Sequence, residues 1–455
     1  MLPDLDNNIK DGNSLIDTDI YDSEIDLGFE RKIKPFSWKK AFPNVFKQDG
    51  FDAVLGNPPY GAEYGDDIKH YLSQKYELAI PIADTFLMFL KKAYNLAKQN
   101  GVVSYIIPST WLYMPQYNQF RRSIINQKII SEIQLFRKPV FEKVTVETCV
   151  LISINATPDK KTNYSFKEVK KESHLFISEN FIKTQLELLK ETESNLVLSN
   201  KEEQNLFNKI KINKPTLTEV ALTVCGLTPY RLGKGVPAQT EKIVKERSFD
   251  ADYKKDKSYR QYLMGRDFNK YTWCIEKERW LSYGDWLAEP RYKAPFNDEK
   301  KIIIRQTSDK LIAHLDTRKY ISLKNVHNVR VKSPNLSYEY LLALLNSKLL
   351  DWWYQKLIPE KGRVFAEVKV VNLEKLPIKL LSEKNKIEKN KHDEIVKNVS
   401  LLLELNEEIN KTKLQTKIDQ IKQRIEHATE KINQLVYELY ELTPEEIAII
   451  EEAAK

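Results

Sequence analysis

Short apolar runs of strand length alternate with amphipathic stretches through the first 155 residues. The runs are rich in β-branched residues, as strands buried in a sheet are, and lie at 51–56, 102–108, 129–136 and 148–154. Between the first two runs, apolar side chains recur three and four residues apart, which predicts a helix over 81–99 that stops before Gly101. With a second helix around 115–128, this alternation predicts a partial doubly wound α/β sheet.

In the rest of the chain, the residue composition and pattern change twice. Residues 156–214 are rich in Lys, Glu and Asn, which predicts a linker with one or two helices. Residues 215–380 hold short strand and turn patterns with interleaved Tyr, Trp, Arg and Lys, which predicts an α+β domain. Residues 383–455 predict a helical coiled-coil tail, because apolar positions recur three and four apart among Lys and Glu. The seam formed by these apolar positions either packs within the chain or joins another subunit. With residues 1–155 as the first domain, these four segments are the expected domains.

Composition narrows the class of protein. The chain has 455 residues, 42% of them hydrophobic and 30% charged, and its longest apolar run is shorter than the roughly 18 residues that span a bilayer. Without a membrane segment or a secretory leader, a cytoplasmic location is expected. Three distant cysteines and six scattered histidines lack metal-ligand spacing, so no metal site is expected. A net charge of +8 favours a polyanionic partner.

The most informative stretch follows the run at 51–56, where Asn57-Pro58-Pro59-Tyr60 forms a stiff elbow. Two consecutive prolines fix the backbone and remove two N–H donors, and Asn57 is held extended because a proline follows it. The elbow presents a carboxamide oxygen, a backbone carbonyl and an aromatic face. Paired acceptors suit an exocyclic NH₂ group, and a ring beside them suits a flipped base.

This tetrad resembles motif IV of the N6-adenine DNA methyltransferases, in particular the gamma-type enzymes of restriction–modification systems. The resemblance implies that Asn57 and Pro58 accept hydrogen bonds from the target N6, that Pro59 stiffens the elbow, and that Tyr60 stacks on the base. It also implies S-adenosylmethionine as the methyl donor. Two alternatives stay open at this point: an ordinary proline-rich turn, and a methyltransferase of glutamine or RNA, which use similar tetrads.

Two weaker matches accompany the elbow. The Gly-Asn-Ser-Leu element at residues 12–15 is similar to motif III, which implies that Asn13 lies near the adenine of S-adenosylmethionine; a plain Gly-Asn turn is the alternative. Val140-Phe141-Glu142-Lys143-Val144 resembles motif VIII, which implies that Phe141 meets the flipped base opposite Tyr60. The alternative for Phe141 is a place in the core.

Residues 215–380 look like the target-recognition domain of type I and type IIG restriction–modification enzymes. Their Arg, Lys, aromatic and Asn side chains suit phosphate anchoring and base-edge readout of double-stranded DNA. Four arginines in the motifs of this region are the expected DNA contacts, with surface salt bridges as the alternative for each. They are Arg266, Arg305, Arg330 and Arg363. This half favours DNA over a glutamine or RNA substrate.

The family's Gly-rich donor-binding turn does not occur upstream of the elbow, since no Gly-x-Gly precedes Asn57. The chain is therefore expected to begin within the methyltransferase domain, with the donor-binding half on a partner polypeptide or lost. The leading hypothesis is site-specific methylation of DNA adenine at N6. A catalytically silent DNA-binding subunit that needs a partner is the rival, and methylation of a protein amide is a third possibility.

Overall fold

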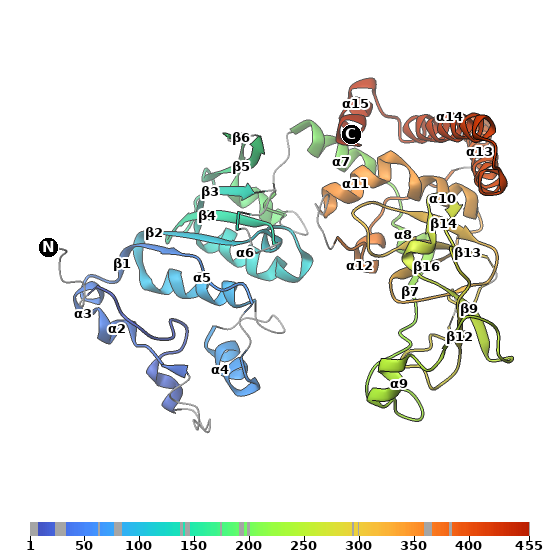
Figure 1. Ribbon diagram of the computed structural model, residues 1–455. Helices are drawn as coiled ribbons and strands as arrows, with labels where there is room; N and C mark the ends of the chain where they lie inside the picture. The colour runs from blue at the N-terminus through green and yellow to red at the C-terminus, as the bar shows by residue number, and fades with distance from the viewer. Residues whose placement is uncertain are drawn as a thin grey trace. The chain divides into compact units, whose positions relative to one another are not determined.

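The computed structural model describes two compact units, residues 1–200 and 201–455, which are treated separately (Figure 1). It describes every residue except 1–7, 23–32, 62–63, 77–83, 137–139, 142–145, 173–174, 191–194, 198–200, 294, 299, 359–365, 382–384 and 455. Within the described ranges, no helix combines the length and apolar character that crossing a membrane requires.

The first unit is built on a six-stranded mixed sheet with the order β1-β2-β4-β3-β5-β6. Its strands are β1 (Phe51–Gly56), β2 (Ala97–Pro108), β3 (Ile129–Phe136), β4 (Thr148–Ile154), β5 (Asn163–Glu172) and β6 (Leu175–Thr184). β1 pairs parallel with β2, and β3 pairs parallel with β5, while β4 runs antiparallel to both β2 and β3. The α/β class predicted from the sequence is confirmed.

Helices complete the first unit. α5 (Thr85–Leu96) packs on β1 and β2, and α6 (Asn118–Gln127) packs on β3. Before the sheet come η1 (Thr18–Asp22), α2 (Trp38–Ala41) and α3 (Pro43–Phe46), and α4 (Asp66–Tyr76) follows the elbow. The connections between β2 and α6 are η2 (Ser109–Leu112) and η3 (Pro115–Tyr117). Each secondary element expected before residue 155 has a counterpart here.

α5 ends earlier than the helix expected over 81–99, whose first three residues lie outside the described part of the chain, and Gly101 lies inside β2 instead of ending a helix. The cause is Asn155, whose side-chain amide donates to the backbone carbonyls of Tyr94 and Ala97 at 3.1 and 2.8 Å. These bonds satisfy carbonyls at the helix end. The chain therefore leaves the helix at Ala97, which already pairs with Phe51 of β1.

The stretch 156–214 is not simply a linker, because β5 and β6 extend the sheet within it. Tyr164 and Phe166 alternate with polar residues and are buried at 1% and 0% exposure, so one face of β5 belongs to the core. Gln185, at the start of η4 (Gln185–Lys190), bonds the backbone of Ile130 at 2.9 Å and of Lys128. Pairing with β3 thus outweighs the Lys- and Glu-rich composition.

The second unit contains two four-stranded sheets and a ribbon of β10 and β11. The first sheet has the order β14-β13-β16-β7 and comprises β7 (Ala221–Cys225), β13 (Lys301–Arg305), β14 (Ala313–Asp316) and β16 (Val326–Val331). The second has the order β15-β9-β12-β8 and comprises β8 (Asp250–Ala251), β9 (Tyr259–Leu263), β12 (Trp280–Ser282) and β15 (Ile321–Ser322). The ribbon is β10 (Phe268–Asn269) with β11 (Thr272–Trp273).

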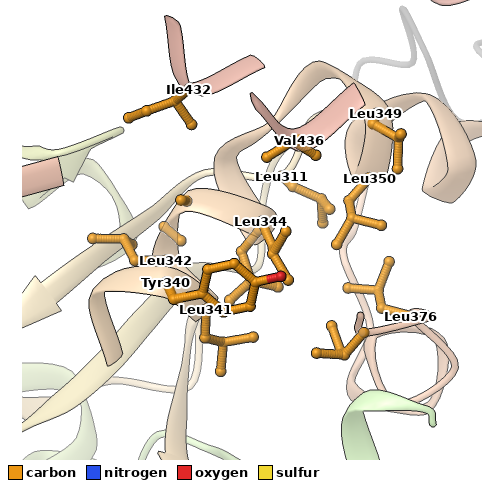
Figure 2. Packing of buried hydrophobic residues seen from close by; sticks show 14 of the residues in the cluster. Leu311, Tyr340, Leu341, Leu342, Leu344, Leu349, Leu350, Leu376, Ile432 and Val436 are labelled. Carbon is orange, nitrogen blue, oxygen red and sulfur yellow. The ribbon is translucent and has the colours of Figure 1, made fainter. Parts of the chain in front are cut away.

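Helices bury the largest hydrophobic cluster of this unit, which includes Leu341, Leu344 and Leu350 (Figure 2). The short helices are α7 (Lys201–Lys211), α8 (Leu217–Val220), α9 (Glu241–Glu246), η5 (Gly265–Asp267), α10 (Tyr338–Asn346), α11 (Lys348–Leu357), α12 (Val370–Leu373) and α15 (Pro444–Ala454). Two long helices, α13 (Lys386–Lys411) and α14 (Gln415–Leu439), pack on one another. Ile432 and Leu435 of the predicted seam lie in the cluster, so this part of the seam packs within the chain.

Candidate active site

The elbow leaves β1 at the edge of the sheet. β1 pairs only with β2 in the described structure, and Leu55 near its end is 76% exposed. The sequence predicts a buried strand here, and the structure differs because no described strand covers the second edge of β1. An exposed apolar edge of this kind is a surface on which another strand can pair.

At the beginning of the elbow, Gly56 lies against the phenol ring of Tyr105. The two residues are partners in the β1–β2 register, and a Cβ at position 56 would lie 2.6 Å from the Tyr105 ring. Only glycine therefore fits beneath this buried ring. Burial also raises the pKa of the Tyr105 hydroxyl, which stays neutral. Tyr105 was not among the sequence candidates; a strand-ending glycine opposite an aromatic residue is the signal for it.

The far side of the elbow is anchored by Thr85, the first residue of α5. Its hydroxyl donates to the carbonyl of Pro59 at 2.7 Å, and the side chain is fully buried. Asp84, just before it, accepts a hydrogen bond from the Tyr117 hydroxyl, which ties the start of α5 to the next connection. The elbow is therefore held at both ends, by Tyr105 and by Thr85.

Between these anchors the four residues of the elbow have different exposures. Asn57 and Pro59 are exposed, Pro58 is buried and Tyr60 is half-buried. The carboxamide of Asn57 makes no hydrogen bond to any other described residue. Since the backbone is fixed on both sides, this carboxamide is free to bind a ligand without reorganising the elbow.

Tyr60 turns its hydroxyl end into the protein. The hydroxyl oxygen is buried and has no hydrogen-bond partner among the described residues. Burial raises the pKa of this hydroxyl, with a smaller contribution from Cys149. Burial also raises the pKa of the Cys149 thiol to about 12, so that no thiolate nucleophile is present beside the elbow. The arrangement offers an aromatic ring and neutral acceptors, not a charged nucleophile.

Asn13 lies in the same unit but its carboxamide is already engaged. Its oxygen accepts from the Leu15 N–H at 3.1 Å, and the side chain also bonds the hydroxyl of Tyr64. Tyr64 follows the elbow in sequence, so this bond connects the Asn13 segment to the chain that leaves the elbow. The predicted contact of Asn13 with the methyl donor stays a prediction.

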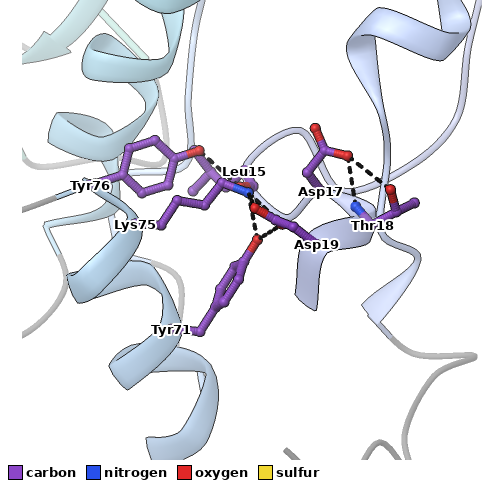
Figure 3. Close-up of polar contacts among 7 residues, drawn as sticks. All are labelled: Leu15, Asp17, Thr18, Asp19, Tyr71, Lys75 and Tyr76. Carbon is purple, nitrogen blue, oxygen red and sulfur yellow. Dashed lines mark hydrogen bonds and ion pairs between the residues drawn. The ribbon is translucent and has the colours of Figure 1, made fainter. Parts of the chain in front are cut away.

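A polar network next to Asn13 joins α4 to η1 (Figure 3). Lys75 donates to both carboxylate oxygens of Asp19 at 2.6 Å, and Tyr71 donates to the same carboxylate. Tyr76 donates to the carbonyl of Leu15 at 2.8 Å. Every bond in this network links groups of the protein to one another, so we assign it a structural role.

The other predicted residues lie apart from the elbow in sequence. Phe141 is half-buried, and the residues that follow it lie outside the described part of the chain. Arg363 also falls outside the described residues. Arg305 donates to the carbonyl of Gly265 at 2.7 Å and to that of Phe268, and burial lowers the pKa of its guanidinium. Arg305 thus holds the turn that carries Arg266.

The two remaining arginines differ in exposure and contacts. Arg266 is exposed, directly before Asp267, which forms a buried ion pair with Arg279 at 2.7 Å. Arg330 on β16 lies 3.5 Å from Asp298 and is 42% exposed. DNA contacts by these arginines stay predictions. Groups of His, Cys, Asp and Glu that could hold a metal ion do not occur in the described ranges.

Comparison with known proteins gives two family matches. Residues 2–141 match the family described as Eco57I restriction-modification methylase, and residues 260–378 match the TaqI-like C-terminal specificity domain. The chain is 26% identical over 392 residues to a putative type II restriction enzyme and methyltransferase of Methanocaldococcus jannaschii, which covers 83% of this chain and 31% of that protein.

A second relative is the type II restriction enzyme and methyltransferase RM.Eco57I of Escherichia coli, 30% identical over 176 residues, which covers 37% of this chain and 16% of that protein. Among solved structures, the type IIL restriction-modification enzyme MmeI in complex with DNA is similar with a TM-score of 0.57 and 13% identity. That match covers 92% of this chain and 59% of the solved one, and supports the fold. The chain spans about a third or less of the length of these curated relatives.

Proposed function

Because the chain joins an Eco57I-type restriction-modification methylase region to a TaqI-like specificity domain, we propose that it methylates the N6 atom of adenine at a specific sequence in double-stranded DNA. The observation that carries the proposal is the anchored elbow with an exposed, unbonded Asn57 carboxamide. The two relatives above are described as restriction enzymes and methyltransferases, which supports the reaction class.

The elbow contacts the base through two hydrogen bonds and one stacked ring. The target adenine leaves the duplex, and its N6 amino group donates one hydrogen bond to the Asn57 Oδ1 and one to the carbonyl of Pro58. Both acceptors draw the N6 hydrogens toward oxygen, which concentrates the lone pair on nitrogen for attack. The ring of Tyr60 stacks on the base and holds its plane, with Phe141 as the proposed opposite wall.

S-adenosylmethionine supplies the methyl group when it is bound, as the methyltransferase class implies. The described residues of this chain do not by themselves make up a site for it. Asn13 already uses its carboxamide within the protein, and no Gly-x-Gly turn precedes Asn57. We therefore propose that a further polypeptide segment, on a partner chain or outside these residues, pairs with the open edge of β1 and carries the donor site.

The same open edge favours a second candidate function, a DNA-binding subunit that is catalytically silent without that segment. Calorimetric titration of the purified chain with S-adenosylmethionine tests whether the chain alone holds a donor site, and heat of binding would contradict the need for a further segment. If no heat is observed, methyl transfer measured after that segment is added separates the two: transfer supports the enzyme, and its absence, with sequence-specific DNA binding retained, supports the silent subunit.

The substrate class is tested by filter binding to duplex DNA, RNA duplexes and unstructured peptides. Duplex DNA is expected to bind most tightly. Its affinity is expected to fall at least about tenfold between 50 and 200 mM salt, because neutralising even two phosphates gives that dependence. Equal affinity for RNA, or a salt-independent affinity, would count against the DNA substrate.

Replacing Tyr60 tests the stacking role. Tyr60→Phe is expected to keep methyl transfer within about twofold of the wild type, because the deleted hydroxyl has no hydrogen-bond partner among the described residues. Tyr60→Ala is expected to lower methyl transfer about tenfold or more, since base–aromatic stacking is lost. Incorporation of labelled methyl groups into duplex DNA measures both. A phenylalanine variant as impaired as the alanine variant would assign the role to the hydroxyl and contradict stacking.

A further inference from the structure

Residues 231–238, called here the 231–238 loop, are exposed although their backbone is firmly held. Every residue of the loop is exposed except Gly235, which is half-buried. Two of its exposed side chains are large and apolar, Leu232 at 57% and Val236 at 73% exposure. Two large apolar side chains exposed within one short, rigid loop form a small apolar surface that a partner can contact.

The rigidity comes from Gln239, which is only 2% exposed. Its side-chain amide donates to the carbonyls of Pro229 and Trp286, both at 2.8 Å, and its oxygen accepts from the Arg231 N–H at 2.9 Å. One buried carboxamide therefore closes the loop at its base and ties it to the segment around Trp286.

Two contacts hold the backbone of the loop against the protein and leave its side chains outside. The N–H of Val236 donates to the carbonyl of Asp285 at 2.9 Å. Gly235 has φ +86°, and a Cβ there would lie 2.3 Å from the carbonyl oxygen of Trp286. The backbone is thus pressed against residues 285–286, and the side chains of Leu232 and Val236 remain outside.

An ordered aromatic surface adjoins the loop. Tyr292, 51% exposed, donates to the Asp285 carboxylate at 2.6 Å and packs edge-on against Tyr283 at 5.5 Å. The guanidinium of Arg260 lies over the Tyr283 ring at 5.0 Å. Aromatic rings that are locked in this way keep their position when a partner binds, which lowers the entropic cost of association.

The loop and the residues that follow it in sequence carry an excess of positive charge. Residues 231–260 contain nine Lys and Arg against five Asp and Glu, an excess of four positive charges. Arg231 and Lys234 flank Leu232 within the loop and are both exposed, and Arg231 also lies 3.4 Å from the exposed carboxylate of Glu289. A polyanion with apolar groups between its charges fits this pattern, and duplex DNA presents thymine methyl groups in the major groove between two phosphate backbones.

We propose that the 231–238 loop enters the major groove of the target DNA, where Leu232 and Val236 contact thymine methyl groups and Arg231 and Lys234 contact phosphates. The inference depends on the DNA-binding part of the proposed function. It assigns sequence readout at these positions to apolar contact on a preformed loop, in addition to any hydrogen bonds from the predicted arginines.

The test begins with selection of duplexes from a random pool by the full chain and by the double variant Leu232→Ser/Val236→Ser. The wild type is expected to enrich a consensus in which at least one thymine preference disappears in the variant. The double variant Val371→Ser/Leu414→Ser is the matched control, because Val371 and Leu414 are similarly exposed, at 53% and 65%, in the same unit. It is expected to select the wild-type consensus.

A second measurement removes the methyl group from the DNA instead. Replacing the preferred thymine by uracil is expected to weaken wild-type binding roughly fourfold per methyl group, as loss of one buried methyl implies, and to leave the double variant unaffected. If the wild type and the loop variant enrich the same consensus, the inference about the loop is overturned and the proposed function is not affected. If the wild type enriches no consensus, the proposed function fails with it.

Discussion

Replacing Asn57 by alanine is expected to lower the rate of methyl transfer by about a hundredfold or more, the usual effect of removing one preorganised hydrogen-bond group from a reaction centre. DNA affinity is expected to stay within about threefold of the wild type, because phosphate contacts elsewhere supply most of the binding energy. Asn57 is exposed and unbonded in the described structure, so the substitution disturbs no internal contact. Initial rates of labelled methyl incorporation, with the segment that carries the donor site present, and filter binding measure the two quantities.

Two further variants sharpen this result. Asn57→Asp keeps an oxygen acceptor and is expected to retain more activity than Asn57→Ala. Asn44→Ala changes an exposed asparagine on α3 and is expected to behave as the wild type. A parallel fall in DNA affinity and rate for Asn57→Ala would mean that Asn57 serves binding in general and not the reacting amine.

Replacing Lys301 by alanine is expected to destabilise the second unit by about 3–5 kcal/mol, the effect of breaking a buried ion pair from one side. Lys301 on β13 and Asp316 on β14 are cross-strand partners, both fully buried, with 2.8 Å between Nζ and the carboxylate. Without the lysine, the Asp316 carboxylate stays in the core and, among the described residues, keeps only the Arg318 N–H as a hydrogen-bond donor, at 2.8 Å. Urea unfolding followed by tryptophan fluorescence measures the change.

The neighbouring residue provides the control. Lys300 pairs with Glu339 at 2.8 Å but is 44% exposed, so Lys300→Ala is expected to change the unfolding free energy by less than about 1 kcal/mol. The double variant Lys301→Met/Asp316→Leu removes both charges and is expected to recover most of the stability lost in Lys301→Ala. Equal effects of the two single alanine variants would contradict the assigned role of the buried pair.

The elbow is predictable from the sequence because its geometry is local. Two prolines and the residue before them restrict the backbone whatever surrounds them, so Asn57, Pro58, Pro59 and Tyr60 stand out at once. The anchor is not predictable in the same way. Thr85 reaches Pro59 across 26 residues, and a threonine at the first position of a helix carries no local sign of that contact.

The misplaced helix end and the overlooked strands have the same origin. The end of α5 depends on Asn155, whose amide bonds Ala97 across 58 residues, and the pattern near Leu96 alone continues as a helix. β5 is rich in Lys and Glu, and its strand conformation depends on pairing with β3, which a local pattern does not contain. Local chemistry thus predicts the elbow, while long-range contacts determine how it is held.

The most direct test exchanges Asn57 for alanine at the chromosomal gene, so that the protein acts with whatever segment or partner it normally has. Mapping modified bases along the genome of the two strains compares them at every recognition site. The account predicts that N6-methyladenine disappears from one sequence motif in the variant strain and is unchanged at all others. Unchanged N6-methyladenine throughout, or loss of a modified cytosine instead, would contradict it.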